Sequence, residues 1–199
     1  GGFSDLSNGG VYSNVDAATM TITDATASMD GYLYKCVVSG NCTPSATSGN
    51  ATLNVEQAPA VTANPSNTTV CVDDDPTFNV TATGDGLTYQ WQVNTGSGFS
   101  NLSNGGVYSN VNAATMNITD ATAAMSGFVY RCEVSGNCTP TATSGSATLT
   151  VQVAPVFTVN PSNSTYCAGS DIDLTVTVTG TSVSLQWQED QGTGFANLS

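Results

Sequence analysis

The chain has 199 residues, no histidine and a formal net charge of −13. Two cations, Lys35 and Arg131, stand against 15 acidic residues, so the sequence lacks the basic side chains that displace counterions from nucleic acid or anionic membranes. No apolar run approaches the ~20 residues that span a bilayer. We therefore expect no nucleic-acid partner and no membrane insertion in this segment.

The sequence aligns with itself after a shift of 96 residues. Gly2–Val55 recurs as Gly98–Val151 without insertion or deletion, and 42 of the 54 aligned positions are identical. The same shift carries Trp91 onto Trp187. A fixed long period indicates one structural unit copied in tandem.

This period divides the chain into three segments. We expect residues 1–57 to be the C-terminal half of a repeat, 58–153 a complete repeat and 154–199 an N-terminal half. Because the chain starts and stops inside a repeat, we expect it to be a window onto a longer array. Each half alone leaves an apolar face and open sheet edges, so we expect its completion by the same polypeptide or by strands of a neighbouring copy.

Alternation of apolar and polar residues predicts seven or so short strands in the complete repeat, and no helical period. In chain order, eight segments are candidates for these strands: Ala58–Val61, Thr68–Cys71, Thr77–Ala82, Leu87–Val93, Phe99–Leu102, Thr115–Thr119, Phe128–Val134 and Ala147–Val151. An all-β chain of this kind forms a two-sheet sandwich or a small barrel. The expected core residues are Val80, Trp91, Tyr130, Cys132 and Leu149.

The linker between repeats is short. Glu56-Gln57-Ala58-Pro59 recurs as Gln152-Val153-Ala154-Pro155, and proline restricts the backbone of each copy. We therefore expect a stiff connection between neighbouring repeats.

Several motifs are similar to those of immunoglobulin-like domains. Tyr89-Gln90-Trp91-Gln92 matches the strand that carries the core tryptophan, and Tyr130 stands two residues before Cys132, as in a tyrosine corner. The resemblance implies tandem immunoglobulin-like β-sandwiches arranged end to end. Val80 and Val176 stand where the family has a cysteine, so the usual disulfide between strands B and F cannot form.

More narrowly, the repeats resemble those of giant surface proteins of Bacteroidota bacteria. Val70-Cys71, Asn104-Gly105-Gly106-Val107-Tyr108 and Tyr130-Arg131-Cys132-Glu133-Val134-Ser135-Gly136 carry this resemblance. It implies an extracellular, cell-surface location and a role as an adhesin, including gliding adhesins, or as a stalk. The alternatives are a filament assembled by strand exchange between copies and an accessory carbohydrate-binding module. Expected partners are neighbouring repeats or other copies, with surface glycans or another cell surface as further candidates.

Three cysteines per repeat, at constant spacing in a chain of secreted character, indicate an oxidising environment. One expectation is a disulfide across a hairpin-sized loop. The expected pairs are Cys36–Cys42 and Cys132–Cys138, with Cys71 and Cys167 unpaired within their own repeats. In the alternative, Cys71 bonds to the F–G loop of the next repeat and Cys132 is a buried thiol.

Other groups of residues are candidate sites. Asp73, Asp74 and Asp75 are a candidate calcium cluster, but the next repeat keeps only one of the three carboxylates, at Asp171, which favours a solvated turn. We expect no metal and no cofactor. Without histidine, no base is available to activate a serine or threonine hydroxyl, so we do not expect an enzyme. For sugar stacking, Trp91 is expected in the core, and Tyr108 remains a candidate.

Overall fold

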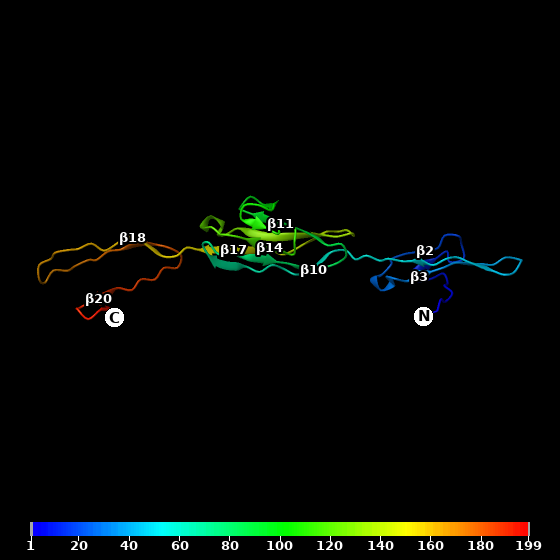
Figure 1. Cartoon of the computed structure of the whole chain (residues 1–199), viewed down its shortest axis with the longest axis horizontal. Coiled ribbons are helices and arrows are strands. Elements are labelled where there is room, and N and C mark those ends of the chain that lie inside the picture. The colour runs from blue at the N-terminus through cyan, green and yellow to red at the C-terminus, as the bar shows by residue number, and fades with distance from the viewer. Residues whose placement is uncertain (1, 199) are drawn as a thin grey trace. The chain divides into compact units, whose positions relative to one another are not determined.

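The computed structural model describes residues 2–198, which form short β-strands and two single-turn 3₁₀ helices, Ala27–Met29 (η1) and Ala123–Met125 (η2) (Figure 1). Contacts group the residues into two compact units. One comprises the residues up to Ala60 together with 82–88 and 134–142, and the other comprises the remainder. These units cut across the expected repeat at 58–153, because the linker before it is bonded to two of its loops.

The N-terminal segment contains six two-residue strands that pair as β1–β2, β3–β6 and β4–β5. Their bounds are Tyr12–Ser13 (β1), Thr21–Ile22 (β2), Leu33–Tyr34 (β3), Val37–Val38 (β4), Ala46–Thr47 (β5) and Ala51–Thr52 (β6). Within residues 2–57, Met29 alone is buried.

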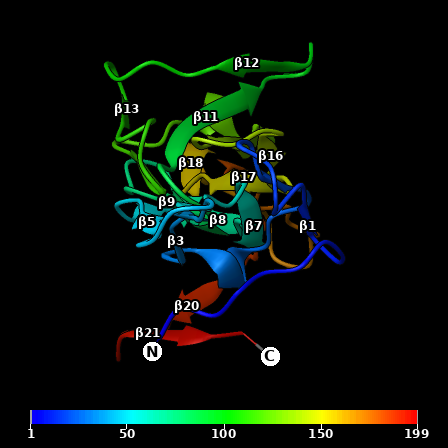
Figure 2. The same cartoon turned by 90° about the vertical axis from the view of Figure 1, so that its right-hand side faces the viewer.

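The first sheet of the central repeat has the strand order β12-β11-β15-β17-β8, with β16 also paired to β15. The bounds are Thr68–Cys71 (β8), Thr88–Asn94 (β11), Phe99–Asn101 (β12), Val129–Ser135 (β15), Ala142–Thr143 (β16) and Ala147–Gln152 (β17). Strands β11 and β12 lie at one edge (Figure 2), and at the other edge β8 runs parallel to β17. Buried and more exposed side chains alternate along both β15 and β17, so that every second side chain lies in the core.

The second sheet of the repeat has the order β13-β14-β9, and β7 pairs with β10 beside it. The bounds are Ala60–Ala63 (β7), Thr77–Asn79 (β9), Thr81–Thr83 (β10), Tyr108–Ser109 (β13) and Thr115–Ile118 (β14). The single strand expected over Thr77–Ala82 is therefore interrupted at Val80. Its N–H still donates to Ala114 O over 3.0 Å, so the buried amide is satisfied.

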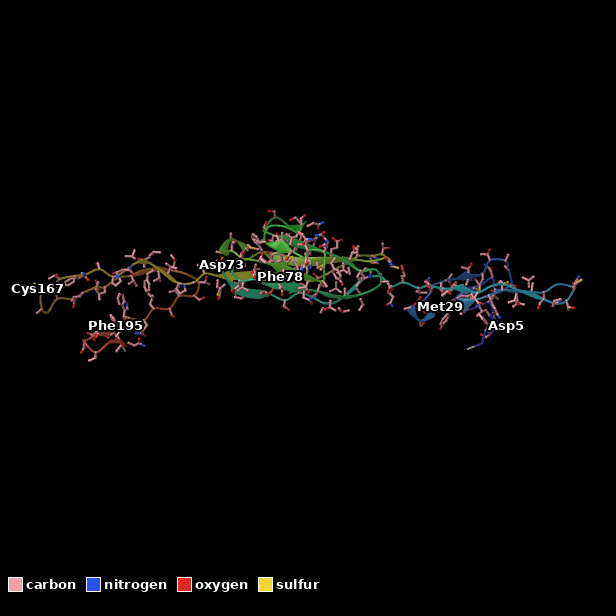
Figure 3. All side chains as sticks on the ribbon, in the orientation of Figure 1. Asp5, Met29, Asp73, Phe78, Cys167 and Phe195 are labelled. Atoms are coloured by element: carbon pink, nitrogen blue, oxygen red, sulfur yellow. The ribbon has the colours of Figure 1, made fainter. Side chains whose placement is uncertain are left out.

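The core of the central repeat is built around aromatic rings. Trp91 is fully buried, its indole N–H donates to Ala113 O over 2.9 Å, and its ring centroid lies 6.4 Å from that of Phe78. The Phe78 centroid lies 4.8 Å from that of Tyr130. The other expected core residues, Val80, Cys132 and Leu149, are at most 1% exposed. Figure 3 shows the side chains crowded around Phe78.

The C-terminal segment contains two hairpin pairs, β18–β19 and β20–β21. Their bounds are Val156–Val159 (β18), Thr177–Thr179 (β19), Gln188–Asp190 (β20) and Phe195–Asn197 (β21). Most of its large apolar side chains are exposed, and so are Phe195 and Cys167, which are labelled in Figure 3. Leu174, which corresponds to the buried Phe78, is 53% exposed. Both sandwich halves are thus needed to bury these positions.

Candidate functional site: the linker junction

The linker before the central repeat is bonded to two loops of that repeat, all within the first compact unit. The Gln57 N–H donates to the Asp85 carboxylate over 2.7 Å, and the Asp85 N–H donates to Gln57 O over 3.1 Å. Asn137 joins from the second loop: its N–H donates to Asp85 O over 3.0 Å, and its side-chain amide donates to Glu56 Oε1 over 2.8 Å. These reciprocal bonds satisfy both the backbone N–H and the carbonyl oxygen of Gln57.

Two glycines allow this close approach. A Cβ at Gly84 would lie 2.9 Å from Ala58 O, and φ of +133° also favours glycine there. A Cβ at Gly136 would lie 2.7 Å from Asp85 O and 3.0 Å from Pro59 Cγ. The loops therefore contact the linker backbone at positions where a larger residue would separate them.

The same arrangement recurs 96 residues later, within the second compact unit. The Val153 N–H donates to the Thr181 hydroxyl over 2.9 Å, and the Thr181 N–H donates to Val153 O over 2.9 Å. Gly180 is again close to the linker proline, because a Cβ there would lie 2.8 Å from Pro155 Cα. An acidic acceptor in one copy and a hydroxyl in the other perform the same function. From the sequence alone, Gly84-Asp85-Gly86 predicts an ordinary turn. The signal for the contact is the recurrence of a glycine followed by a side-chain acceptor, as Gly84-Asp85 and Gly180-Thr181.

All six cysteines are free thiols in the structure. The hairpin disulfides Cys36–Cys42 and Cys132–Cys138 stay predictions. The Cys132 thiol is buried and donates to Glu133 O, with 3.6 Å between sulfur and oxygen. The Cys138 thiol donates to a different acceptor, Glu56 O, with 3.5 Å between the atoms. Each thiol of this pair therefore has a partner other than its expected one.

Cys132 and its counterpart Cys36 allow a direct comparison of the reactivity of a buried thiol and an exposed one. Burial raises the pKa of Cys132 from 9.0 to about 11, which lowers its thiolate fraction near pH 8 by about 100-fold. Its counterpart Cys36 is exposed. We expect iodoacetamide to alkylate Cys36 at least about 100-fold faster than Cys132 in the native protein. Peptide mass mapping over time measures both rates, and comparable rates would contradict this placement.

The acidic turn does not gather its carboxylates. Asp74 Oδ2 accepts the Cys71 N–H over 2.7 Å, while Asp75 Oδ1 accepts the Asp120 N–H over 2.9 Å. Within residues 2–198, no group of three His, Cys, Asp or Glu side chains is arranged to hold a metal ion. Asp73, Asp74 and Asp75 thus form a turn stabilised by backbone bonds, and the calcium candidate has no structural support.

The tyrosine before the buried cysteine pairs with a second tyrosine. The Tyr130 hydroxyl lies 3.2 Å from that of Tyr108, and burial raises the pKa of Tyr130. The pair recurs as Tyr12 and Tyr34, with hydroxyls 3.3 Å apart. Tyr108 packs edge-on against Tyr130 and is half-buried, which argues against a sugar-stacking platform.

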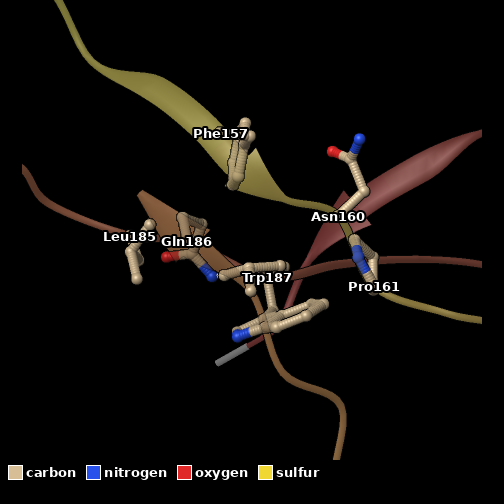
Figure 4. Close-up of a pocket in the computed structure, with 7 residues that line it drawn as sticks. Phe157, Asn160, Pro161, Leu185, Gln186 and Trp187 are labelled. Carbon is tan, nitrogen blue, oxygen red and sulfur yellow. Dashed lines mark hydrogen bonds between the residues drawn. The ribbon is translucent and has the colours of Figure 1, made fainter. Parts of the chain in front are cut away.

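A pocket of about 210 Å³ lies on the C-terminal segment, lined by Trp187, Phe157 and Leu185 among others (Figure 4). Trp187 is 37% exposed, whereas its counterpart Trp91 is fully buried. Val176 also lines the pocket, and its counterpart Val80 is core. The pocket is therefore the position of a sandwich core and not a surface shaped for a sugar.

Both cations are engaged by aromatic rings. Arg131 Cζ lies 4.0 Å from the centroid of Phe99, and its Nε–H donates to Gln92 Oε1 over 2.7 Å. Lys35 Nζ lies 4.2 Å from the centroid of Phe3, the counterpart of Phe99. Each cation is thus paired with the phenylalanine at the equivalent position of its own copy.

Comparison with solved structures identifies the fold. The I-band fragment I67–I69 from titin matches with a TM-score of 0.69 and 20% sequence identity, over 98% of this chain and 67% of that one. The chain has the fold of tandem immunoglobulin-like domains. Sidekick-1 immunoglobulin domains 1–5 match with a TM-score of 0.52 and 22% identity over 86% of this chain and 38% of that one.

The eight N-terminal immunoglobulin domains of the Down syndrome cell adhesion molecule match with a TM-score of 0.53 and 19% identity, over 67% of this chain and 17% of that one. At these identities the likeness concerns the immunoglobulin-like fold alone. No protein-family model matches the sequence, and no curated protein matches it. Neither of the helices described within residues 2–198 is long and apolar enough to cross a membrane.

Proposed function

We propose that this chain is a non-enzymatic structural and adhesive repeat of a long extracellular protein at the cell surface, of the type found in Bacteroidota adhesins and stalks. The observation that carries the proposal is the recurring junction. Gln57–Asp85 and Val153–Thr181 make the same reciprocal bonds at two successive linkers. A linker bonded in this way in every repeat maintains one connection geometry along an array.

The surface chemistry agrees with this role. A net charge of −13 keeps neighbouring chains apart and soluble, and the two cations are stacked on phenylalanine rings. The fold is shared with tandem domains that include a cell adhesion molecule. Neighbouring repeats are the first partners of each domain, and the tip of the array contacts glycans or another cell surface.

A second candidate is a filament in which copies exchange strands. It is favoured by apolar residues that are exposed in the two half-repeats although their counterparts are buried. Val38 is 62% exposed where Val134 is fully buried, and Leu174 is 53% exposed where Phe78 is 1% exposed. A half-repeat of one copy would cover the complementary half of another.

One experiment on the producing cells separates these functions. We expect an antibody raised against residues 58–153 to label intact, unpermeabilised cells, and the reactive species to run as a very large chain under reducing, denaturing conditions. A band near the 20.2 kDa of this chain would instead support the strand-exchanged filament. Labelling only after permeabilisation, with intact cells unstained, would overturn the surface location in both cases.

A further inference from the structure

Cys138 lies at the junction with the preceding repeat. Its sulfur is 3.5 Å from Glu56 O, and the neighbouring Asn137 side chain bonds to Glu56 Oε1 over 2.8 Å. Cys138, in the loop that follows β15, thus contacts the backbone of Glu56, the residue before Gln57.

Cys71 lies beside the last strand of the repeat, β17. Strand β8 runs parallel to β17 with Cys71 opposite Gln152, and the Val72 N–H donates to Gln152 O over 3.0 Å. The side chain of Cys71 is exposed, whereas that of Val70 points inward. Cys71 therefore lies on the outer face beside the last strand residue of the repeat.

The repeat connects these two observations, because Gln152 is the counterpart of Glu56. Cys138 contacts the carbonyl oxygen of Glu56 at the first junction. At the second junction the equivalent oxygen, Gln152 O, accepts the N–H of Val72, the residue after Cys71. At every junction, the Cys71 of one repeat thus lies beside the position that the Cys138 of the next repeat contacts. Within one repeat, Cys138 contacts the linker that precedes the repeat, whereas Cys71 lies beside Gln152, which precedes the following linker.

We propose that Cys71 of each repeat and the Cys138 counterpart of the following repeat form a disulfide across the junction. The two thiols lose two protons and two electrons to a disulfide donor, through a mixed disulfide, and the donor is reduced to a dithiol. Of the three cysteines in each repeat, one bonds forward, one bonds backward, and Cys132 stays a thiol. Such a bond fixes the linker covalently where the hydrogen bonds already hold it.

Cys132 is a poor competitor for Cys138. It is fully buried, and burial raises its pKa to about 11, so little thiolate is present to attack a disulfide. Cys71 is exposed at the edge strand β8, where a disulfide donor has access. The three-cysteine pattern therefore has one pairing in which both partners are accessible and near each other.

The test uses the full chain extended by one further copy of residues 58–153, placed directly after Val153. This creates one junction at which Cys71 of the first copy and Cys138 of the second copy face each other. The protein is oxidised with glutathione disulfide, and the remaining thiols are alkylated with iodoacetamide. We expect two fewer alkylated thiols than after full reduction, and a linked peptide that joins Cys71 to Cys138.

Two single variants serve as matched controls. Cys71→Ser in the first copy should abolish the linked peptide, whereas Cys71→Ser in the second copy should leave it unchanged. A Cys132–Cys138 peptide, a full set of alkylated thiols, or equal effects of the two variants would overturn the proposal. The inference builds on the proposed tandem array, but its failure would leave the cell-labelling result intact, so the two are distinguishable.

Discussion

Replacing Trp91 by alanine is expected to remove a large share of the stability of the central repeat. The side chain is fully buried against Phe78 and donates to Ala113 O, so the variant loses packing and leaves a cavity. Truncation of a buried aromatic costs ~3–5 kcal/mol, out of ~5–15 kcal/mol for a domain. The melting temperature of the central repeat should fall by more than about 10 °C in calorimetry.

The chain contains a matched control for this experiment. Trp187 occupies the equivalent position but is 37% exposed, so Trp187→Ala removes the same side chain from a site with less buried area. We expect its effect on the main transition to be a few degrees at most. A shift of only one or two degrees for Trp91→Ala, or equal shifts for the two variants, would show that the core is placed incorrectly.

Replacing Gly136 by alanine is expected to release the linker from its loops. The new Cβ would lie 2.7 Å from Asp85 O and 3.0 Å from Pro59 Cγ, so the backbone must move apart at a cost of about 1–3 kcal/mol. The amides of Gln57 and Asn137, both bonded to Asp85, should then exchange hydrogen faster. Small-angle scattering should change from a narrow to a broad distribution of inter-repeat geometries.

Gly40→Ala is the matched control, because Gly40 is the counterpart of Gly136 and a Cβ there meets no atom within 4 Å. We expect this variant to leave both exchange and scattering unchanged. Unchanged amide protection in Gly136→Ala would contradict the bonded linker. A broad distribution of geometries in the unmodified protein would contradict the stiff connection itself.

Much of the fold follows from local sequence patterns. Alternation along Val129–Ser135 and Ala147–Gln152 locates both strands and their buried faces, because side chains in a strand point to opposite sides in turn. The interruption at Val80 was not predicted, because the inward pattern continues through it while the pairing partner changes from β14 to β7. Which strand pairs with which is a nonlocal property that alternation does not encode.

Most of the linker junction, in contrast, could not be predicted from the sequence. The sequence located the linker and its proline, but not the loops that bind it, because Asp85 and Asn137 are far from Gln57 in the chain and resemble ordinary turn residues. Likewise, spacing suggested Cys132–Cys138, whereas burial directs Cys132 inward and the junction holds Cys138 against Glu56.

By itself, the sequence determined the 96-residue period, the all-β class, the core tryptophan and the absence of basic surface, because each depends on residue type and spacing alone. Only the tertiary structure decided which loops bind the linker and where each thiol lies. Those outcomes depend on hydrogen bonds and packing between residues distant in the chain, such as Glu56 and Asn137, which meet only after the strands have paired.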